Sequence, residues 1–479
     1  MASSSKSQNI YAPASSAYPY TIGVSFNENS TSVGDNTSSV TVTGTMYAKN
    51  IRWSQTANNT LALYWYDNCS CSSGKLIGTI NISTFTKNYT YTISDTISVP
   101  HNSDGSLKGY AKLVFTKNVT NNYAPPTTNL STDNIDLTTI PRASTMSFGT
   151  GYVEEALYIG INRNSTSFTH KITYNFGDLS GTVASSAGDS CSWTIPSTFY
   201  NQIGASSTYK TGTLSLETYN GSTKIGDTKS YTLTVYCRES KCIPTLTGTI
   251  IDSNSTTTNV TGSNKTLVDY MSTAKITLSY TAKNGASISK IYINDVEKTV
   301  QSTHTFTPNS SSYVVRVVDS RGYSKSVTFS TSSSGDYYFN RIEYIPLSFT
   351  AKTSRPTQTG SSMQVSIDGK FFNGYFNSTT ANTLTISWKY RVQGASSWTT
   401  GSTSIALTKS GNTFYVTNKT IGSSWNYQKV YEFEYTIKDK LMSATYNCTV
   451  PKGTASFIVF EDGIMLNGVF LAVETAESW

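Results

Sequence analysis

Charged residues are scarce in this 479-residue chain, where Asp, Glu, Lys and Arg make up 14% of the sequence, against about 25% in an ordinary globular domain. The 36 basic and 29 acidic residues give a net charge of +7 and are spread thinly. A nucleic-acid-binding surface needs clustered Lys and Arg, so we expect no nucleic-acid partner. Low charge together with 12% aromatic residues also excludes a disordered chain.

Long hydrophobic runs are missing as well. No apolar stretch approaches the roughly 20 residues that a membrane-spanning helix needs, so we expect no membrane insertion. The first 25 residues lack the basic segment and apolar core of a secretory signal. Asn-x-Ser/Thr sequences, as at Asn81, Asn88 and Asn118, are therefore interpreted as a consequence of composition and not as glycosylation sites.

Cysteine and histidine are also few. The six cysteines, at positions 69, 71, 191, 237, 242 and 448, are too sparse for a disulfide scaffold in a chain of this length. Cys69-Ser-Cys71 and Cys237-x4-Cys242 lack the Cys-x2-Cys spacing of a zinc site, so reduced structural thiols are favoured over a metal site.

No motif of catalytic type accompanies the three histidines, which are His101, His170 and His304. The sequence contains no nucleophile elbow, no zinc-binding His-Glu-x-x-His and no phosphate loop. Because the acidic residues are scattered along the chain, two of them could still meet in the fold as the carboxylate pair of a glycosidase. We predict that the protein is not an enzyme and that it holds no cofactor and no metal.

What the chain has in abundance is Tyr, with 33 residues, together with Ser, Thr, Asn and Val. These residues have low helix propensity, and the aromatic and β-branched ones favour strands. Apolar and polar residues alternate along the sequence, as in the runs 40–46, 61–65 and 384–392. Alternation interrupted by turn signals about every ten residues predicts antiparallel β-sandwiches.

The predicted fold is all-β, with four consecutive β-sandwich modules of Ig-like or jelly-roll-like type forming an elongated rod. Proline-containing stretches and restarts of the strand pattern place the modules at residues 1–144, 145–241, 242–338 and 339–479. The last module ends in an apolar hairpin at 457–473. Because an isolated apolar hairpin needs a neighbour to cover it, we expect a homo-oligomer, specifically a trimer.

Aromatic residues cluster at three places: Tyr64-Trp65-Tyr66, Tyr337-Tyr338-Phe339, and Phe371-Phe372 with Tyr375-Phe376. Rings on a sheet surface stack against sugars and contact proteins at a low entropic cost. We select Tyr64, Trp65, Tyr66, Tyr375 and Phe376 as candidate ligand-binding residues. The competing interpretation, favoured for each cluster, is that these rings pack in cores and between modules.

Several motifs resemble those of a family of minor structural proteins from tailed bacteriophages, chiefly long-tailed phages of Gram-positive bacteria. The matching stretches occur in the order of that family. They are Val99-Pro-His-Asn-Ser-Asp-Gly-Ser106, Thr139-Ile-Pro-Arg-Ala-Ser144, Phe168-Thr-His170, Tyr174-Asn-Phe-Gly177, Trp193-Thr-Ile-Pro196, Leu216-Glu-Thr-Tyr-Asn-Gly-Ser-Thr-Lys-Ile-Gly226, Val318-Asp-Ser-Arg-Gly322 and Phe460-Glu-Asp-Gly-Ile464.

The resemblance implies a component of the virion tail, such as a tail tip or fibre, assembled in the cytoplasm of the host bacterium. Its expected partners are other tail proteins and a glycan of the host cell surface. Two alternatives remain: an architectural neck, baseplate or capsid-decoration protein without ligand contact, and a depolymerase that cleaves the host glycan.

Overall fold

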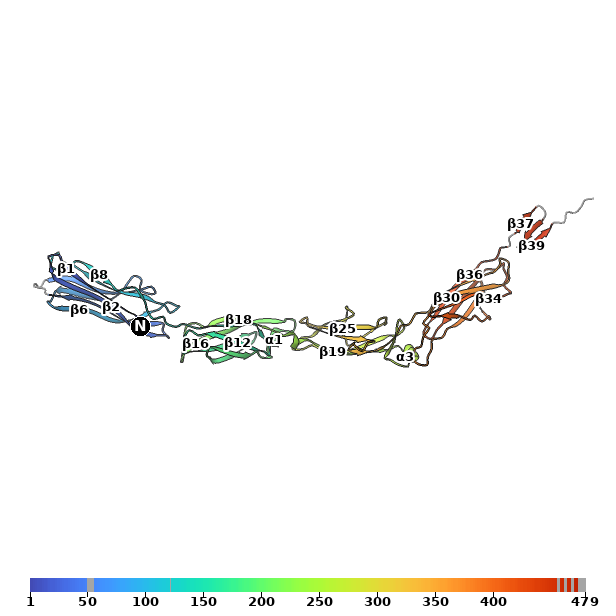
Figure 1. Cartoon of the computed structure of the whole chain (residues 1–479), viewed down its shortest axis with the longest axis horizontal. Coiled ribbons are helices and arrows are strands. Elements are labelled where there is room, and N and C mark those ends of the chain that lie inside the picture. Colours follow the sequence, from blue (N-terminus) through green and yellow to red (C-terminus); the bar gives the residue numbers. More distant parts are fainter. Residues whose placement is uncertain (50–55, 121, 455–456, 461–462, 467–468, 473–479) are drawn as a thin grey trace, which may run out of the picture. The chain divides into compact units, whose positions relative to one another are not determined.

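A computed structural model describes residues 1–49, 56–120, 122–454, 457–460, 463–466 and 469–472. Nearly every element is a β-strand (Figure 1). The described residues include three short helices, α1 (Phe199–Ile203), α2 (Glu239–Cys242) and α3 (Ser255–Thr261). The chain divides into two compact units, Met1–Arg238 and Glu239–Trp479. The all-β prediction is confirmed.

Two antiparallel sheets open the N-terminal unit. The first has the strand order β1-β2-β3-β6, and the second has the order β5-β4-β7-β8 with β9 beside β7. The strands are β1 (Ser3–Ala12), β2 (Ser15–Ser32), β3 (Thr37–Ala48), β4 (Thr56–Asp67), β5 (Lys75–Thr84), β6 (Tyr89–Pro100), β7 (Lys108–Thr116), β8 (Thr128–Ser131) and β9 (Ile135–Asp136).

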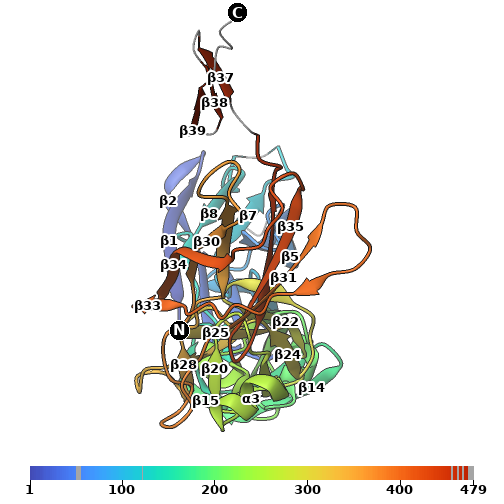
Figure 2. The same cartoon turned by 90° about the vertical axis from the view of Figure 1, so that its right-hand side faces the viewer.

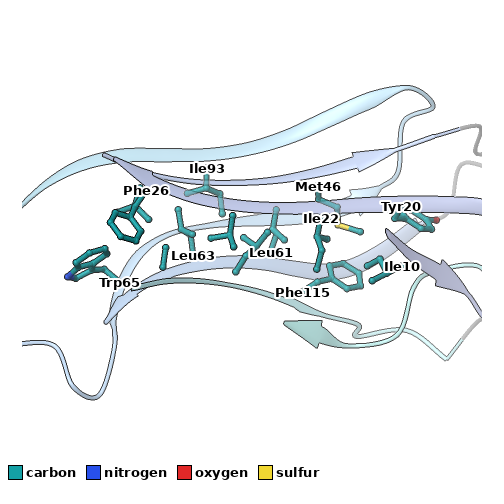
Figure 3. Close-up of a cluster of buried hydrophobic side chains, with 14 of the residues drawn as sticks. Ile10, Tyr20, Ile22, Phe26, Met46, Leu61, Leu63, Trp65, Ile93 and Phe115 are labelled. Carbon is teal, nitrogen blue, oxygen red and sulfur yellow. The ribbon is translucent and has the colours of Figure 1, made fainter. Parts of the chain in front are cut away.

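The core between these sheets includes the alternating apolar positions that the sequence predicted in the runs 40–46 and 61–65, together with residues of β1 and β2 (Figure 3). The ring of Phe26 in β2 meets Trp65 in β4 edge-on, with 5.2 Å between centroids. A Cβ at Gly44 of β3 would lie 2.5 Å from the Leu113 side chain of β7. The absence of a side chain at Gly44 therefore lets the two sheets pack closely.

The second pair of sheets in this unit has the orders β10-β12-β15 and β11-β18-β16-β13-β14, with β17 beside β16. Only β11 pairs in parallel, with β18, among the described strands of this pair. The strands are β10 (Thr145–Phe148), β11 (Gly151–Tyr152), β12 (Ala156–Asn162), β13 (Phe168–Phe176), β14 (Leu179–Ala187), β15 (Ser190–Thr194), β16 (Tyr209–Asn220), β17 (Thr223–Lys224) and β18 (Lys229–Tyr236).

The C-terminal unit begins with a three-stranded sheet, β19-β21-β24, and a five-stranded sheet, β23-β22-β25-β26-β27. A short parallel pair, β20-β28, completes this part. The strands are β19 (Thr245–Asp252), β20 (Thr266–Val268), β21 (Ala274–Thr281), β22 (Ile288–Ile293), β23 (Val296–Lys298), β24 (Thr303–Phe306), β25 (Ser312–Asp319), β26 (Ser324–Ser330), β27 (Tyr337–Tyr338) and β28 (Asn340–Ile342). Although β28 follows the predicted boundary at 338/339, it pairs back to β20. The four-module division stays a prediction.

The last pair of sheets has the orders β29-β30-β34-β33 and β32-β31-β35-β36. The strands are β29 (Ser348–Ser354), β30 (Met363–Lys370), β31 (Thr385–Val392), β32 (Thr399–Thr400), β33 (Thr408–Ser410), β34 (Thr413–Gly422), β35 (Tyr431–Lys438) and β36 (Ser443–Val450). On β31, Trp388 faces the core while Lys389 and Arg391 face outward, as the alternation predicted. The two basic residues pair with Glu434 and Glu432 of β35.

The C-terminal apolar segment differs from the expected two-stranded hairpin. It forms a small antiparallel sheet of three strands, β37 (Phe457–Phe460), β38 (Gly463–Leu466) and β39 (Val469–Ala472) (Figure 2). The sequence between β38 and β39 is Asn467-Gly468, a strong two-residue hairpin signal that the prediction overlooked. Glu461 and Asp462, assigned to the hairpin turn, lie outside the described residues.

Candidate binding site

Two of the five residues predicted to bind ligand lie in cores and present no ring to solvent. Trp65 is fully buried, and its indole N–H donates to Asp67 Oδ2 at 2.9 Å. Phe376 is 3% exposed and packs with Val268 and Tyr344. For these two residues, the interpretation as core side chains is correct.

The other three predicted residues reach the surface to different degrees. Tyr66 stacks on Tyr110 with 4.8 Å between ring centroids and 5° between ring planes, and a Cβ at Gly74 would lie 2.5 Å from Tyr66 Cζ. Contacts within the protein therefore occupy much of this ring. Tyr64 is half-buried beside it, and Tyr375 is 65% exposed. Tyr64, Tyr66 and Tyr375 remain predicted ligand contacts.

A different surface offers a concave site, on the outer face of the β29-β30-β34-β33 sheet. An open groove of about 560 Å³ crosses three strands there; Figure 2 labels β30, β33 and β34 of this sheet. The strand register defines its shape, because paired residues on neighbouring strands point to the same side. Gly369 is paired with Phe349 on one side and with Phe414 on the other, and these three residues form the floor.

Two rows of outward side chains flank this floor. One row is Ser348–Lys370–Thr413, and the other is Thr350–Asp368–Tyr415, each running across β29, β30 and β34. A Cβ at Gly369 would lie 2.2 Å from Phe414 Cζ. Gly369 therefore allows the Phe414 ring to pack beneath the groove, where that ring is 1% exposed.

Three side chains of the groove, those of Asp368, Lys370 and Tyr415, are available to a ligand. The Tyr415 side chain is 42% exposed. Neither Asp368 nor Lys370 forms an ion pair or a side-chain hydrogen bond with the part of the chain that the structure describes. An exposed ring beside unpaired polar groups is the combination that holds a sugar, with the ring stacking on its apolar face and the polar groups binding hydroxyls.

The sequence analysis missed this site. Asp368 and Lys370 sit in one alternating strand and Tyr415 in another, so each residue alone has the pattern of an ordinary exposed position. The signal lies in the cross-strand register of segments more than 40 residues apart. Alternation shows which residues share a face within one strand, but it does not reveal which strands pair.

The motifs behind the family resemblance lie at structural positions. His101 is 4% exposed. Its Nδ1 lies 2.8 Å from the Gly105 carbonyl oxygen, and its Nε2 lies 2.7 Å from Ser38 Oγ. Ser38 in turn donates to Glu28 Oε1 at 2.7 Å. Ser38 is fully buried, so this His–Ser–Glu arrangement ties the loop to the sandwich and is closed to a substrate.

The neighbouring motif, Thr139–Ser144, joins the first and second pairs of sheets. The Ile140 N–H donates to the Gly105 carbonyl at 3.0 Å. On the other side, the Ser144 N–H donates to Thr218 Oγ1 at 3.1 Å. Three of the recognised motifs therefore converge on the connection between the two sandwiches of the N-terminal unit.

All six cysteines are free, and Cys237 and Cys242 are buried. No group of three or more His, Cys, Asp or Glu side chains among the described residues could hold a metal ion. Within the same residues, no helix has the length and apolar character required to cross a membrane.

Paired sheets of mostly antiparallel strands, repeated along one chain, define a multidomain β-sandwich protein. The chain belongs to a siphovirus protein family: the family model described as siphovirus protein of unknown function (DUF859) matches residues 14–469. The expected relation to a protein family of long-tailed phages is confirmed. No curated protein matches the chain significantly.

The chain also matches solved structures at low identity and low TM-score. The eight N-terminal Ig domains of Down Syndrome Cell Adhesion Molecule match at 8% identity and a TM-score of 0.25, covering 94% of this chain and 63% of that chain. Domains FN1–FN3 of chicken CNTN1 match at 8% identity and a TM-score of 0.22, covering 89% and 97%. Three N-terminal domains of the Highly Immunogenic Outer Capsid protein of bacteriophage RB49 match at 8% identity and a TM-score of 0.20, covering 65% and 99%.

Proposed function

We propose that this protein is a structural component of the siphovirus tail and that it binds a glycan of the host cell surface. The observation that supports binding is the groove on the β29-β30-β34-β33 sheet, in which the exposed Tyr415 ring lies beside unpaired Asp368 and Lys370. Family membership supports the assignment to the virion. A homotrimer, built through the C-terminal apolar strands, would present several copies of this groove together and so raise avidity.

The test is retention of the full chain by purified cell walls from the strain on which the phage grows. We expect Tyr415→Ser to weaken retention roughly fivefold, because one aromatic contact contributes about 1 kcal/mol. Tyr158→Ser is the matched control, since Tyr158 is 66% exposed and lies outside the groove. Equal loss in both variants, or no effect of either, would contradict the groove as the binding site.

Two further variants test the residues selected from the sequence. If Tyr64 and Tyr375 contact the glycan, Tyr64→Ser and Tyr375→Ser will reduce retention as Tyr415→Ser does. If retention depends on Tyr415 alone, the aromatic clusters serve packing.

The second candidate function is purely architectural, as a neck, baseplate or capsid-decoration protein. The hydrogen-bonded connection between the first two sandwiches supports it, because such a connection suits a spacer. Absence of wall retention by the full chain would favour this function. Release of reducing sugar from the walls would instead indicate a depolymerase.

A further inference from the structure

The two rows of side chains that flank the groove differ in chemical character. Lys370 stands between two hydroxyl residues, Ser348 and Thr413, in the first row. The Thr413 hydroxyl donates to the Ser410 carbonyl at 2.6 Å, so the Lys370 ammonium group and the Ser348 hydroxyl are the donors that suit a phosphate or carboxylate. The second row has the opposite chemical character.

In the second row, Asp368 is directly paired with Tyr415 across β30 and β34. A carboxylate attracts a cationic group, and the face of a tyrosine ring does so as well. Thr350 completes this row and adds a hydroxyl. One side of the groove thus suits an anion and the other side suits a cation.

The opposite charges of Asp368 and Lys370 do not neutralise each other. The two residues lie two positions apart on β30, so their Cα atoms are about 6.8 Å apart along the strand. Their side chains form no ion pair with one another. On the facing sheet the situation is different, because Lys389 pairs with Glu434 at 2.9 Å.

Other grooves on sheet faces of the described chain lack such a pair of opposite, unpaired charges. Two smaller grooves, of about 320 and 290 Å³, lie on the outer face of β1, β2 and β3. Serine, threonine and asparagine supply nearly all of their polar side chains. The one charged residue that borders them, Lys6, lies on the same side of β1 as Ile10 of the core and forms an ion pair with Asp133 at 2.6 Å.

We infer that the groove on the β29-β30-β34-β33 sheet recognises a zwitterionic saccharide unit, carrying an amine and a phosphate or carboxylate. The anionic group lies against Lys370 and Ser348, and the amine lies against Asp368 and Tyr415. This inference rests on the proposed glycan-binding function and specifies its ligand class. A neutral sugar would leave both charges without a partner.

Four related sugars test the inference on the full-length chain: glucose, glucosamine, glucose 6-phosphate and glucosamine 6-phosphate. Ligand-observed NMR at low salt, where exposed charges are least screened, gives the Kd of each. We expect glucosamine 6-phosphate to bind at least tenfold more tightly than glucose, and the two singly charged sugars to fall between them.

Two variants, each removing one charge, assign that charge to its partner on the ligand. Lys370→Gln should remove the gain in affinity that the phosphate gives and keep the gain that the amine gives. Asp368→Asn should remove the gain from the amine and keep the gain from the phosphate. Equal affinity for all four sugars, or no binding of any, would overturn the zwitterionic assignment.

The cell-wall assay separates this outcome from failure of the proposed function. If Lys370→Gln and Asp368→Asn are retained as strongly as the unmodified chain, the ligand is not zwitterionic, yet glycan binding stands. If the unmodified chain is not retained, the proposed function itself fails.

Discussion

At the scale of single residues, Gly105 shows why a family motif contains glycine. Its φ is +83°, a region where a residue with a side chain is strained. A Cβ at this position would also lie 1.9 Å from the Ile140 carbonyl oxygen. Both constraints arise where the loop after β6 contacts the segment that leaves the first sandwich.

We therefore expect Gly105→Ala to lower the free energy of unfolding of the N-terminal unit by about 2–4 kcal/mol, from backbone strain and overpacking together. Urea denaturation measures the change. Gly221→Ala is the matched control, because Gly221 also has positive φ, +61°, but nothing lies within 4 Å of its Cβ position. It should lose only about 1–2 kcal/mol. Equal losses would show that the contact with Ile140 contributes nothing.

Glu28 is a buried carboxylate, 1% exposed. Burial acts to raise its pKa, but hydrogen bonds from Ala2, Ser38 and Thr138 outweigh burial, and the pKa of Glu28 is lowered below its ordinary value. A lowered folded-state pKa means that this group stabilises the fold above the unfolded-state pKa of about 4.3 and that the contribution is lost as the pH falls further.

Glu28→Gln should therefore destabilise the N-terminal unit by about 1–3 kcal/mol at pH 7 and by progressively less below about pH 4.3. Denaturation at pH 7, 5, 4 and 3 gives the two curves, which should converge at low pH. Asp136→Asn serves as a control, since the Asp136 side chain is 80% exposed. A constant difference between wild type and Glu28→Gln at every pH would refute the assignment.

At the scale of elements, the sequence was most informative where a strand has one buried and one exposed face. The alternation in β3, β4 and β31 correctly predicted the inward side chains, because the two-residue period of a strand separates its faces. The same alternation places Trp65 beside Leu61 and Leu63 in the core. The pattern of its own strand therefore argued against selecting Trp65 as a ligand contact. Phe376 lies in a loop, where no period distinguishes buried from exposed rings.

The groove required more than alternation. Its two rows bring together residues 348–350, 368–370 and 413–415, and that meeting depends on the pairing of β29, β30 and β34. Pairing partners and register are determined by tertiary packing. The sequence predicts that each residue of the two rows is exposed on its own strand, but it does not predict that they meet in one site.

The small β37-β38-β39 sheet bears on the predicted trimer. A three-stranded sheet owes its stability to a hydrophobic face, and an exposed apolar face marks a contact surface for another chain. We expect deletion of residues 455–479 to convert the trimer to monomer, as measured by light scattering coupled to size-exclusion chromatography. The thermal unfolding of the remaining chain should be unchanged. An oligomer that survives the deletion would refute a role of these strands in assembly.

At the scale of the whole molecule, the chain consists of two compact units that each contain their own apolar cores. The N-terminal unit carries the motifs that connect its sandwiches, whereas the C-terminal unit carries the candidate groove. If the groove binds the proposed glycan, structural and binding roles belong to different parts of the chain. A substitution that destabilises one unit should leave the other folded.

Matched core substitutions test this division. Val42 in β3 and Val365 in β30 are both fully buried, so Val42→Ala and Val365→Ala remove the same atoms from different units. Each should cost about 2 kcal/mol, which corresponds to a shift of about 4–8 °C in Tm for a unit of this size. In calorimetry, we expect Val42→Ala to shift one transition and Val365→Ala to shift another, with cell-wall retention impaired only when the transition of the C-terminal unit is exceeded. If both variants move a single common transition, the two units unfold as one cooperative body, and a separation of structural and binding roles by unit is wrong.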